Sequence, residues 1–181
     1  MLLASRWLER RRLAMAAPFL DPPVLDVGCG RCVAFEVSPT GYAGIDHNRQ
    51  SILEPSRSGI QVVQGSALHL PFRPQSFQTV LLMAVLEHLR DPHAYLKEAT
   101  RVLKPGGRVV ITTPTPAGQR IHHLLAQFGI TSKHAAKDHQ SIFSATALKD
   151  VVEDIGLEIE FHRLFLLGWN QICVGSLGPG E

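Results

Sequence analysis

The sequence has few cysteines, no long apolar run and little net charge, and each of these absences excludes a class of protein. Its 181 residues include only three cysteines, Cys29, Cys32 and Cys173. An odd number of cysteines gives no disulfide framework and suits a reducing compartment, so we expect a cytoplasmic protein. No apolar run is long enough to span a bilayer, so we expect no membrane insertion. The net charge of +2 is too small to indicate a nucleic-acid partner.

Near the N-terminus, basic residues precede an apolar segment in a pattern that imitates a secretory signal. The basic residues are Arg10, Arg11 and Arg12, and residues 13–20 follow them. This apolar segment is short and contains Pro18. Cleavage after it would fall beside the strand that we expect at Val24. We therefore predict an N-terminal helix within residues 1–20 that lies on the edge of the domain. The apolar side of this helix would carry Leu3, Trp7, Leu8 and Leu13.

Strand and helix signals alternate along the rest of the chain, which predicts one α/β domain over residues 1–181 with a largely parallel sheet. Strand patterns occur at 24–27, 41–46, 60–64, 77–83 and 108–113. Helical patterns occur at 31–37, 48–54, 92–103 and 145–155. Two apolar stretches at 157–166 and 171–174 predict an antiparallel hairpin at the C-terminus.

The first predicted strand ends in a glycine turn that suits a ligand site. Gly28 and Gly30 have no side chains, so the backbone there can approach a bound molecule closely. Asp46 ends the second strand, where a carboxylate can accept hydrogen bonds from both hydroxyls of a ribose. The third glycine of a dinucleotide-binding turn is missing, because Val33 stands in its place. Asp26 before the turn would repel a pyrophosphate and would suit the cationic end of a ligand.

Five sequence blocks resemble class I S-adenosylmethionine-dependent methyltransferases, in particular the small-molecule branch called type 11. They lie in the family's order and spacing between Val24 and Pro114. The blocks are Asp26-x-Gly28-x-Gly30, Gly44-Ile45-Asp46, Gly65-Ser66-Ala67-x-x-Leu70-Pro71-Phe72, Val85-Leu86-Glu87-His88-Leu89 and Leu103-Lys104-Pro105-Gly106-Gly107. The resemblance implies a Rossmann-like sheet of seven strands with helices on both faces and a reversed last strand. It also implies S-adenosylmethionine as the cofactor.

The resemblance assigns cofactor-binding roles to particular residues. The methionine end of the cofactor would be lined by Asp26, Gly28, Cys29 and Gly30. Asp46 would bind the ribose hydroxyls, and His47 would pack on the adenine. The adenine edge would meet Ser66 and Ala67, and Met83 would border the methyl group.

Two positions depart from the family pattern. The family commonly has a small residue where this chain has Cys32, and it usually has an aspartate where this chain has Ser66. A serine hydroxyl can still accept a hydrogen bond from the adenine amino group, but it is a weaker, neutral partner. We therefore expect looser cofactor binding than in relatives that keep the acid.

Methyl transfer requires mainly alignment, so few catalytic residues are expected. A base is needed only when the acceptor arrives protonated, and a neutral imidazole can take that proton near pH 7. The candidates are His88, in a family block near the methyl-bearing edge, and His139, just before the helix that Ser144 caps. Each histidine could instead bond a backbone carbonyl in a purely structural role.

The acceptor would be a small molecule, and residues 114–143 would form the lid that selects it. This region is irregular in pattern and rich in histidine. The fourth strand ends in Leu82-Met83-Ala84-Val85. It lacks the Asn/Asp-Pro-Pro-aromatic block that resembles enzymes methylating amino groups of nucleic-acid bases, which counts against such acceptors. The identity of the acceptor and the oligomeric state remain open.

Other interpretations fit parts of the sequence. The fold and Asp46 also suit a nicotinamide-dependent oxidoreductase, although that class favours a third glycine. Cys32 and Ser66 would equally suit a non-catalytic module that only binds S-adenosylmethionine. Cys29-x-x-Cys32 has the spacing of a redox pair. The histidines of the lid match no standard metal-ligand spacing, so we expect no metal.

Overall fold

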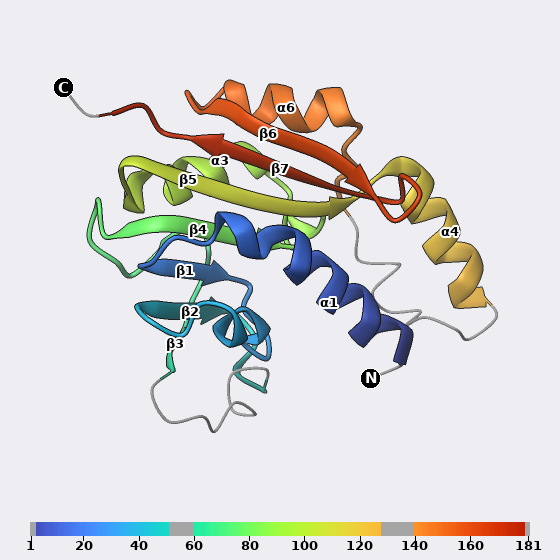
Figure 1. The fold of residues 1–181 in the computed structure, drawn as a ribbon, viewed down its shortest axis with the longest axis horizontal. Helices are drawn as coiled ribbons and strands as arrows, with labels where there is room; N and C mark the ends of the chain where they lie inside the picture. Colours follow the sequence, from blue (N-terminus) through green and yellow to red (C-terminus); the bar gives the residue numbers. More distant parts are fainter. Residues whose placement is uncertain (1–2, 51–59, 128–139, 180–181) are drawn as a thin grey trace.

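The computed structural model describes residues 3–50, 60–127 and 140–179, and its centre is a seven-stranded sheet. The strands lie in the order β3-β2-β1-β4-β5-β7-β6 (Figure 1). Only β7 runs antiparallel to its neighbours. This arrangement confirms the predicted α/β fold with a reversed last strand. The strands are β1 (Val24–Val27), β2 (Tyr42–Asp46), β3 (Gln61–Gln64), β4 (Phe77–Met83), β5 (Leu103–Pro114), β6 (Glu158–Phe165) and β7 (Asn170–Ser176).

The strand register brings the motif residues to one edge of the sheet. β1 lies between β2 and β4, with Asp26 opposite Gly44 on one side and Leu81 on the other. The three strands run parallel, so Val27, Asp46 and Met83 all lie at their carboxyl ends. Ligands of open α/β sheets bind at this edge, where neighbouring connections diverge.

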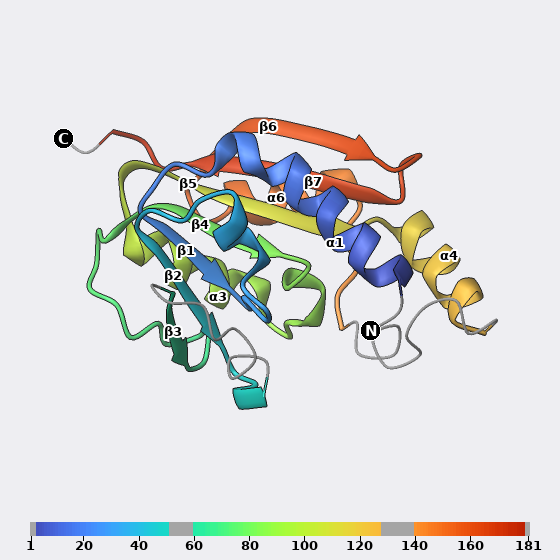
Figure 2. The same ribbon diagram turned by 60° about the horizontal axis from the view of Figure 1, so that its bottom comes forward.

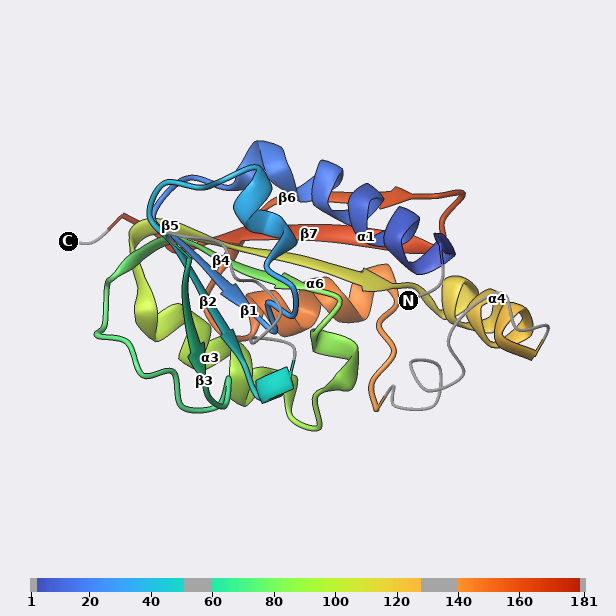
Figure 3. The same ribbon diagram turned by 90° about the horizontal axis from the view of Figure 1, so that it is seen from below.

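Helices cover the two faces of the sheet, as Figure 3 shows from below. The helix α1 (Leu3–Ala16) and the short turn η1 (Ala17–Phe19) lie on one face. Leu13 and Ala16 of α1 and Leu20, just after η1, are buried. They share a core with Val24, Leu81, Val110 and Ile172. The helices α3 (Pro92–Val102) and α6 (Ala145–Glu153) cover the other face. They enclose a second core with Leu25, Val80, Leu82 and Ile111.

Alternation along each buried strand explains why these two cores form. Successive side chains of a strand point to opposite faces. Leu81 therefore packs toward α1, whereas its neighbour Leu82 packs toward α3 and α6. The helices begin where the sequence predicts, because Asp91 and Ser144 each accept a hydrogen bond from a backbone N–H in the first turn of α3 and α6.

Three segments differ from the sequence-based predictions. The helix expected at 31–37 is only a 3₁₀ turn, η2 (Val33–Glu36), because Cys32 has a left-handed backbone with φ 56° and the chain reaches Pro39 soon afterwards. β5 begins at Leu103 rather than at Arg108. Residues 116–127 form a helix, α4 (Pro116–Gln127), where an irregular lid was expected. Pro116 occupies the start of that helix, where its missing N–H costs nothing.

The helix α4 extends past the end of the sheet at which β5 finishes and β7 begins (Figure 2). The N-terminus lies at this same end, and the C-terminus lies at the opposite end (Figure 1). Most of the helix predicted at 48–54 falls outside the described residues.

Candidate functional site

Two adjoining cavities open at the carboxyl edge of the sheet. The first has a volume of about 290 Å³ and lies between α1 and the ends of β1 and β4. The second has a volume of about 390 Å³ and lies beyond the ends of β1 and β2. Gly28, Ala84 and His88 line both cavities, so the two adjoin at these residues. An elongated ligand with one end in each cavity would pass these three residues.

The first cavity brings together one group of the residues predicted from the sequence, namely Asp26, Gly28, Cys29, Gly30, Met83 and His88. Asp26 is buried, and its Oδ2 accepts a hydrogen bond of 2.7 Å from the hydroxyl of Tyr42. Burial raises the pKa of Asp26 to about 7, although the Tyr42 bond acts in the opposite direction. The pKa of Tyr42 is raised by burial and by the neighbouring carboxylate.

The glycine turn is held against Asp46 at the end of β2. The N–H of Gly30 donates to Asp46 Oδ2 at 2.9 Å, and the N–H of Asn48 donates to Asp46 Oδ1 at 2.8 Å. Gly28 has φ +69°, and a Cβ there would lie 2.5 Å from Cγ2 of Val85. Only glycine fits this position without strain, because both the backbone angle and the space exclude a side chain.

The second cavity contains the other group of predicted residues, namely Asp46, His47, Ser66 and Ala67. The side chain of His47 is 90% exposed, and its Nδ1 lies 3.5 Å from Asp46 Oδ1. The hydroxyl oxygen of Ser66 accepts a hydrogen bond of 3.2 Å from the N–H of Leu68. An oxygen with two lone pairs keeps one for a further donor. Apolar walls surround these groups and include Val27, Ile45, Val85, Leu89 and Tyr95.

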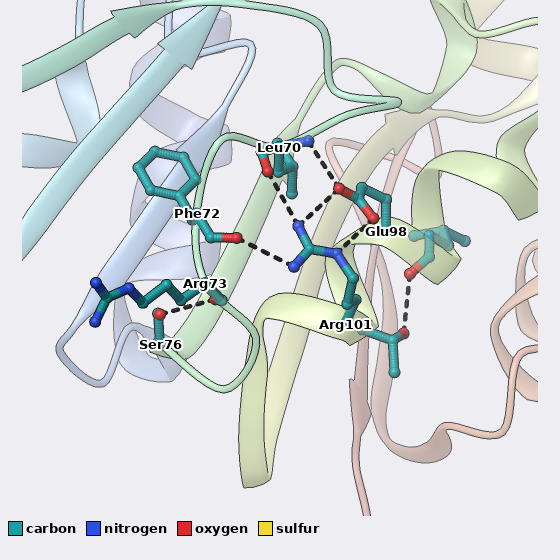
Figure 4. A network of polar contacts seen from close by, with 8 residues as sticks. Leu70, Phe72, Arg73, Ser76, Glu98 and Arg101 are labelled. Carbon is teal, nitrogen blue, oxygen red and sulfur yellow. Dashed lines mark hydrogen bonds and ion pairs between the residues drawn. The ribbon is translucent and has the colours of Figure 1, made fainter.

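A polar network holds the connector that carries Ser66 and Ala67 (Figure 4). The guanidinium of Arg101 on α3 forms a two-point contact with Glu98, with both N···O distances 2.8 Å. It also donates to the carbonyl oxygens of Leu70 and Phe72 at 3.0 and 3.1 Å. Glu98 in turn accepts from the N–H of Leu70 at 2.8 Å. The connector between β3 and β4 is therefore fixed to α3.

The two cysteines of the turn, Cys29 and Cys32, are buried thiols. Hydrogen bonding with Cys32 and burial both raise the pKa of Cys29 well above its usual range. A thiolate is the reactive form of cysteine, so this environment opposes redox chemistry. Gly44 allows Cys29 to pack tightly, because a Cβ on Gly44 would lie 2.8 Å from its sulfur. These cysteines therefore fill the core beneath the turn.

The helix α1 forms a part of the site that was not predicted from the sequence. One stripe of this helix lines the first cavity, with Ala4, Ser5, Leu8, Glu9 and Arg12 on it. The spacing of Ala4, Leu8 and Arg12 at intervals of four was a usable signal for a shared helical face. Trp7, which was expected on the apolar side, is instead 52% exposed with Arg11 over its ring. The helix covers the site as well as the sheet.

Two hydrogen bonds attach α1 to opposite sides of the first cavity. Arg31, just after the glycine turn, donates to Glu9 Oε2 at 2.9 Å. Arg12 Nε donates to Oδ1 of Asn170, at the start of β7, also at 2.9 Å. Glu87, which was also not singled out from the sequence, lines the cavity and accepts a bond of 3.1 Å from the hydroxyl of Thr113. These partners are distant in sequence, so no local pattern reveals them.

Two residues of the predicted lid (residues 114–143), Pro114 and Gly118, line the first cavity. His139 lies outside the described residues. Within the described part of the chain, no cluster of three or more potential metal ligands occurs. A search of the same residues finds no helix with the length and apolar character needed to cross a membrane.

Comparisons with known proteins place the chain in a family. A family model described as a methyltransferase domain matches residues 3–161. The demethylmenaquinone methyltransferase of Lactobacillus johnsonii is 30% identical, over 83% of this chain and 74% of that protein. The enzyme of the same name from Listeria monocytogenes is 34% identical, over 51% of this chain and 45% of that protein.

A solved structure shares the fold. It is a putative methyltransferase from Haloferax volcanii in complex with the Trm112 methyltransferase activator. The likeness has a TM-score of 0.76 at 19% identity and covers 96% of this chain and 93% of that one. Together with the site at the carboxyl edge, the family match confirms the expected enzyme class and cofactor. The chain belongs to the S-adenosylmethionine-dependent methyltransferases.

Proposed function

We propose that this enzyme transfers the methyl group of S-adenosylmethionine to a small molecule bound beneath α1. The observation that supports this proposal is the pair of cavities meeting at Gly28, Ala84 and His88. In this arrangement the second cavity takes the nucleoside part of the cofactor. The first takes its methionine end and the acceptor. Since α1 covers the first cavity, the acceptor must be small.

The residues of the two cavities have the chemistry that the cofactor needs. Each oxygen of Asp46 accepts one backbone N–H and keeps a lone pair for a ribose hydroxyl. The apolar walls suit adenine, beside Ser66, Ala67 and the exposed ring of His47. The buried carboxylate of Asp26 suits an ammonium group. Gly28, Cys29 and Gly30 would leave room for the methionine backbone, and Met83 would border the methyl group.

The enzyme's own part in the reaction is orientation. S-adenosylmethionine supplies a methyl group already activated by a sulfonium. The chain holds both reactants in line across the junction of the cavities, and such positioning supplies up to ~7–11 kcal/mol of barrier lowering. His88 lines both cavities and is a candidate to accept a proton from the acceptor.

The relatives suggest which acceptor to test first. Two similar proteins are named demethylmenaquinone methyltransferases. A reduced naphthoquinone ring is therefore the first compound in an acceptor panel, followed by small phenols, amines and thiols. The readout is formation of S-adenosylhomocysteine. Binding of S-adenosylhomocysteine without turnover on any acceptor would favour the alternative of a non-catalytic module.

A ligand comparison separates this proposal from an oxidoreductase. S-adenosylhomocysteine should raise the melting temperature, and NAD should not. Replacing Asp46 with alanine should weaken S-adenosylhomocysteine binding at least tenfold by calorimetry, because two ribose hydroxyls lose their acceptor. Asp150→Ala, at an exposed site on α6, is the matched control. Stabilisation by NAD alone, or unchanged affinity in Asp46→Ala, would contradict the proposal.

A further inference from the structure

Two charged side chains that have no role in the proposed cofactor binding line the first cavity, one a cation and the other an anion. Arg12 reaches the cavity from α1, and Glu87 reaches it from the segment after β4. Asn170 accepts the hydrogen bond from Arg12 Nε, and Thr113 donates to Glu87 Oε2. Each group is thus fixed by its own neutral partner at the wall of one cavity. Among the residues that the structure describes, Arg12 makes its hydrogen bond through Nε, so its two Nη groups remain to bind a ligand.

Burial shifts the pKa values of both Glu87 and Arg12. Glu87 is only 2% exposed, and burial raises its pKa, while the charge of Arg12 counteracts this effect. Burial likewise lowers the pKa of Arg12, and Glu87 and Glu9 counteract it. A buried carboxylate with a raised pKa accepts a proton more readily than an exposed one.

The hydrogen-bonding capacities of the pair define the ligand that fits between them. An arginine can only donate hydrogen bonds, and an ionised glutamate can only accept them. A hydroxyl group satisfies both, because it accepts from one partner and donates to the other. A carboxylate would satisfy Arg12 but would place a second negative charge beside Glu87. An ammonium group would satisfy Glu87 but would place a second positive charge beside Arg12.

We propose that Arg12 and Glu87 select an acceptor that carries an acidic hydroxyl, such as a phenol or an enol. Arg12 donates to the hydroxyl oxygen, and Glu87 accepts its proton. This inference rests on the proposed methyl transfer and names its substrate class. It also assigns proton acceptance to Glu87 rather than to His88.

The step balances without a further reactant. The O–H bond of the acceptor breaks, its proton moves to the Glu87 carboxylate, and its electron pair stays on the oxygen beside Arg12. The resulting oxyanion, or a carbon conjugated with it, forms the new bond to the methyl group. The carbon–sulfur bond breaks, and its electron pair remains on sulfur. Glu87 then releases its proton to solvent.

The test uses two probes that differ only in the group under study, 4-chlorophenol, which is neutral at pH 7, and 4-chlorobenzoate, which is ionised. Each is titrated by calorimetry into the full chain saturated with S-adenosylhomocysteine. The wild-type protein should bind the phenol at least tenfold more tightly than the benzoate. Arg12→Gln should weaken phenol binding at least tenfold. Glu87→Gln should improve benzoate binding relative to phenol, because an amide donates to a carboxylate without repelling it.

Controls separate this inference from the proposed function and from misfolding. Arg10→Gln, at an exposed position of the same helix, should bind both probes as the wild type does. Melting temperature and S-adenosylhomocysteine affinity are measured first for every variant. If Glu87→Gln fails to fold, the phenol affinity of Arg12→Gln still tests the proposed substrate class. Tighter binding of the benzoate, binding of neither probe, or unchanged phenol affinity in Arg12→Gln would overturn the substrate class. Loss of S-adenosylhomocysteine binding by the wild type would instead overturn the proposed function.

Discussion

At the scale of single residues, the ionisation of Asp26 makes the cofactor site sensitive to pH. Burial raises its pKa to about 7 in the folded protein, well above the ordinary value near 4. A raised carboxyl pKa gives stability that is fully present below the unfolded value. This stability is lost as the pH rises through the folded value. The ionised form is then the one available to bind a ligand cation.

We expect S-adenosylhomocysteine affinity to increase as the pH rises from 5 to 7 and to level off above 7. The cationic amino group of the ligand favours ionised Asp26, so the increase should approach about tenfold per pH unit. Asp26→Asn should remove this pH dependence and weaken binding above pH 7. Calorimetry across this range checks the prediction. An affinity that falls with rising pH, or an unchanged profile in Asp26→Asn, would contradict it.

Gly28 is the residue of the turn with the least tolerance for a side chain. Gly28→Ala should lower the free energy of unfolding by about 1–3 kcal/mol, because its Cβ would meet Val85 and its φ is positive. Gly30→Ala is a matched control, since Gly30 also has a positive φ but has open space around it. Its cost should be nearer 1 kcal/mol. Urea denaturation without ligand makes the comparison, and equal losses would disprove the close contact. Val85→Ala should partly rescue Gly28→Ala.

At the scale of elements, the connector between β3 and β4 depends on α3. Arg101→Met should lower the stability by about 2 kcal/mol, because Glu98 and two carbonyl oxygens lose a charged donor. Ser66 and Ala67 lie on this connector, so S-adenosylhomocysteine affinity should also fall severalfold. Lys97→Met, exposed on the same helix, is the control. A lower melting temperature with unchanged affinity would show that the connector keeps its shape without Arg101.

The same elements show what the sequence could reveal. The motif residues of β1, β2 and β4 meet because parallel strands present their carboxyl ends at one edge, a rule that needs no contact information. Arg12 and Asn170 meet only through the packing of α1 against β7, across 158 positions of sequence. The prediction of a helix after the glycine turn was wrong, because Cys32 adopts a left-handed backbone conformation that its residue type does not indicate.

At the scale of the whole molecule, the sheet separates two cores with different consequences for the site. The core beneath α1 contains Leu81 and holds the helix that carries Arg12. The core on the opposite face contains Leu82 and holds α3 and α6. Both leucines are fully buried at adjacent positions of β4, so they form a matched pair.

Leu81→Ala and Leu82→Ala should each lower the free energy of unfolding by roughly 3 kcal/mol, because each leaves a cavity of similar size. Their local effects should differ. Leu81→Ala should increase hydrogen exchange in α1 and weaken 4-chlorophenol binding to the S-adenosylhomocysteine complex, since α1 positions Arg12. Leu82→Ala should increase exchange in α3 and α6 and leave α1 protected. Identical exchange patterns would mean that the two faces open as one unit, and the acceptor site would then depend on global stability alone.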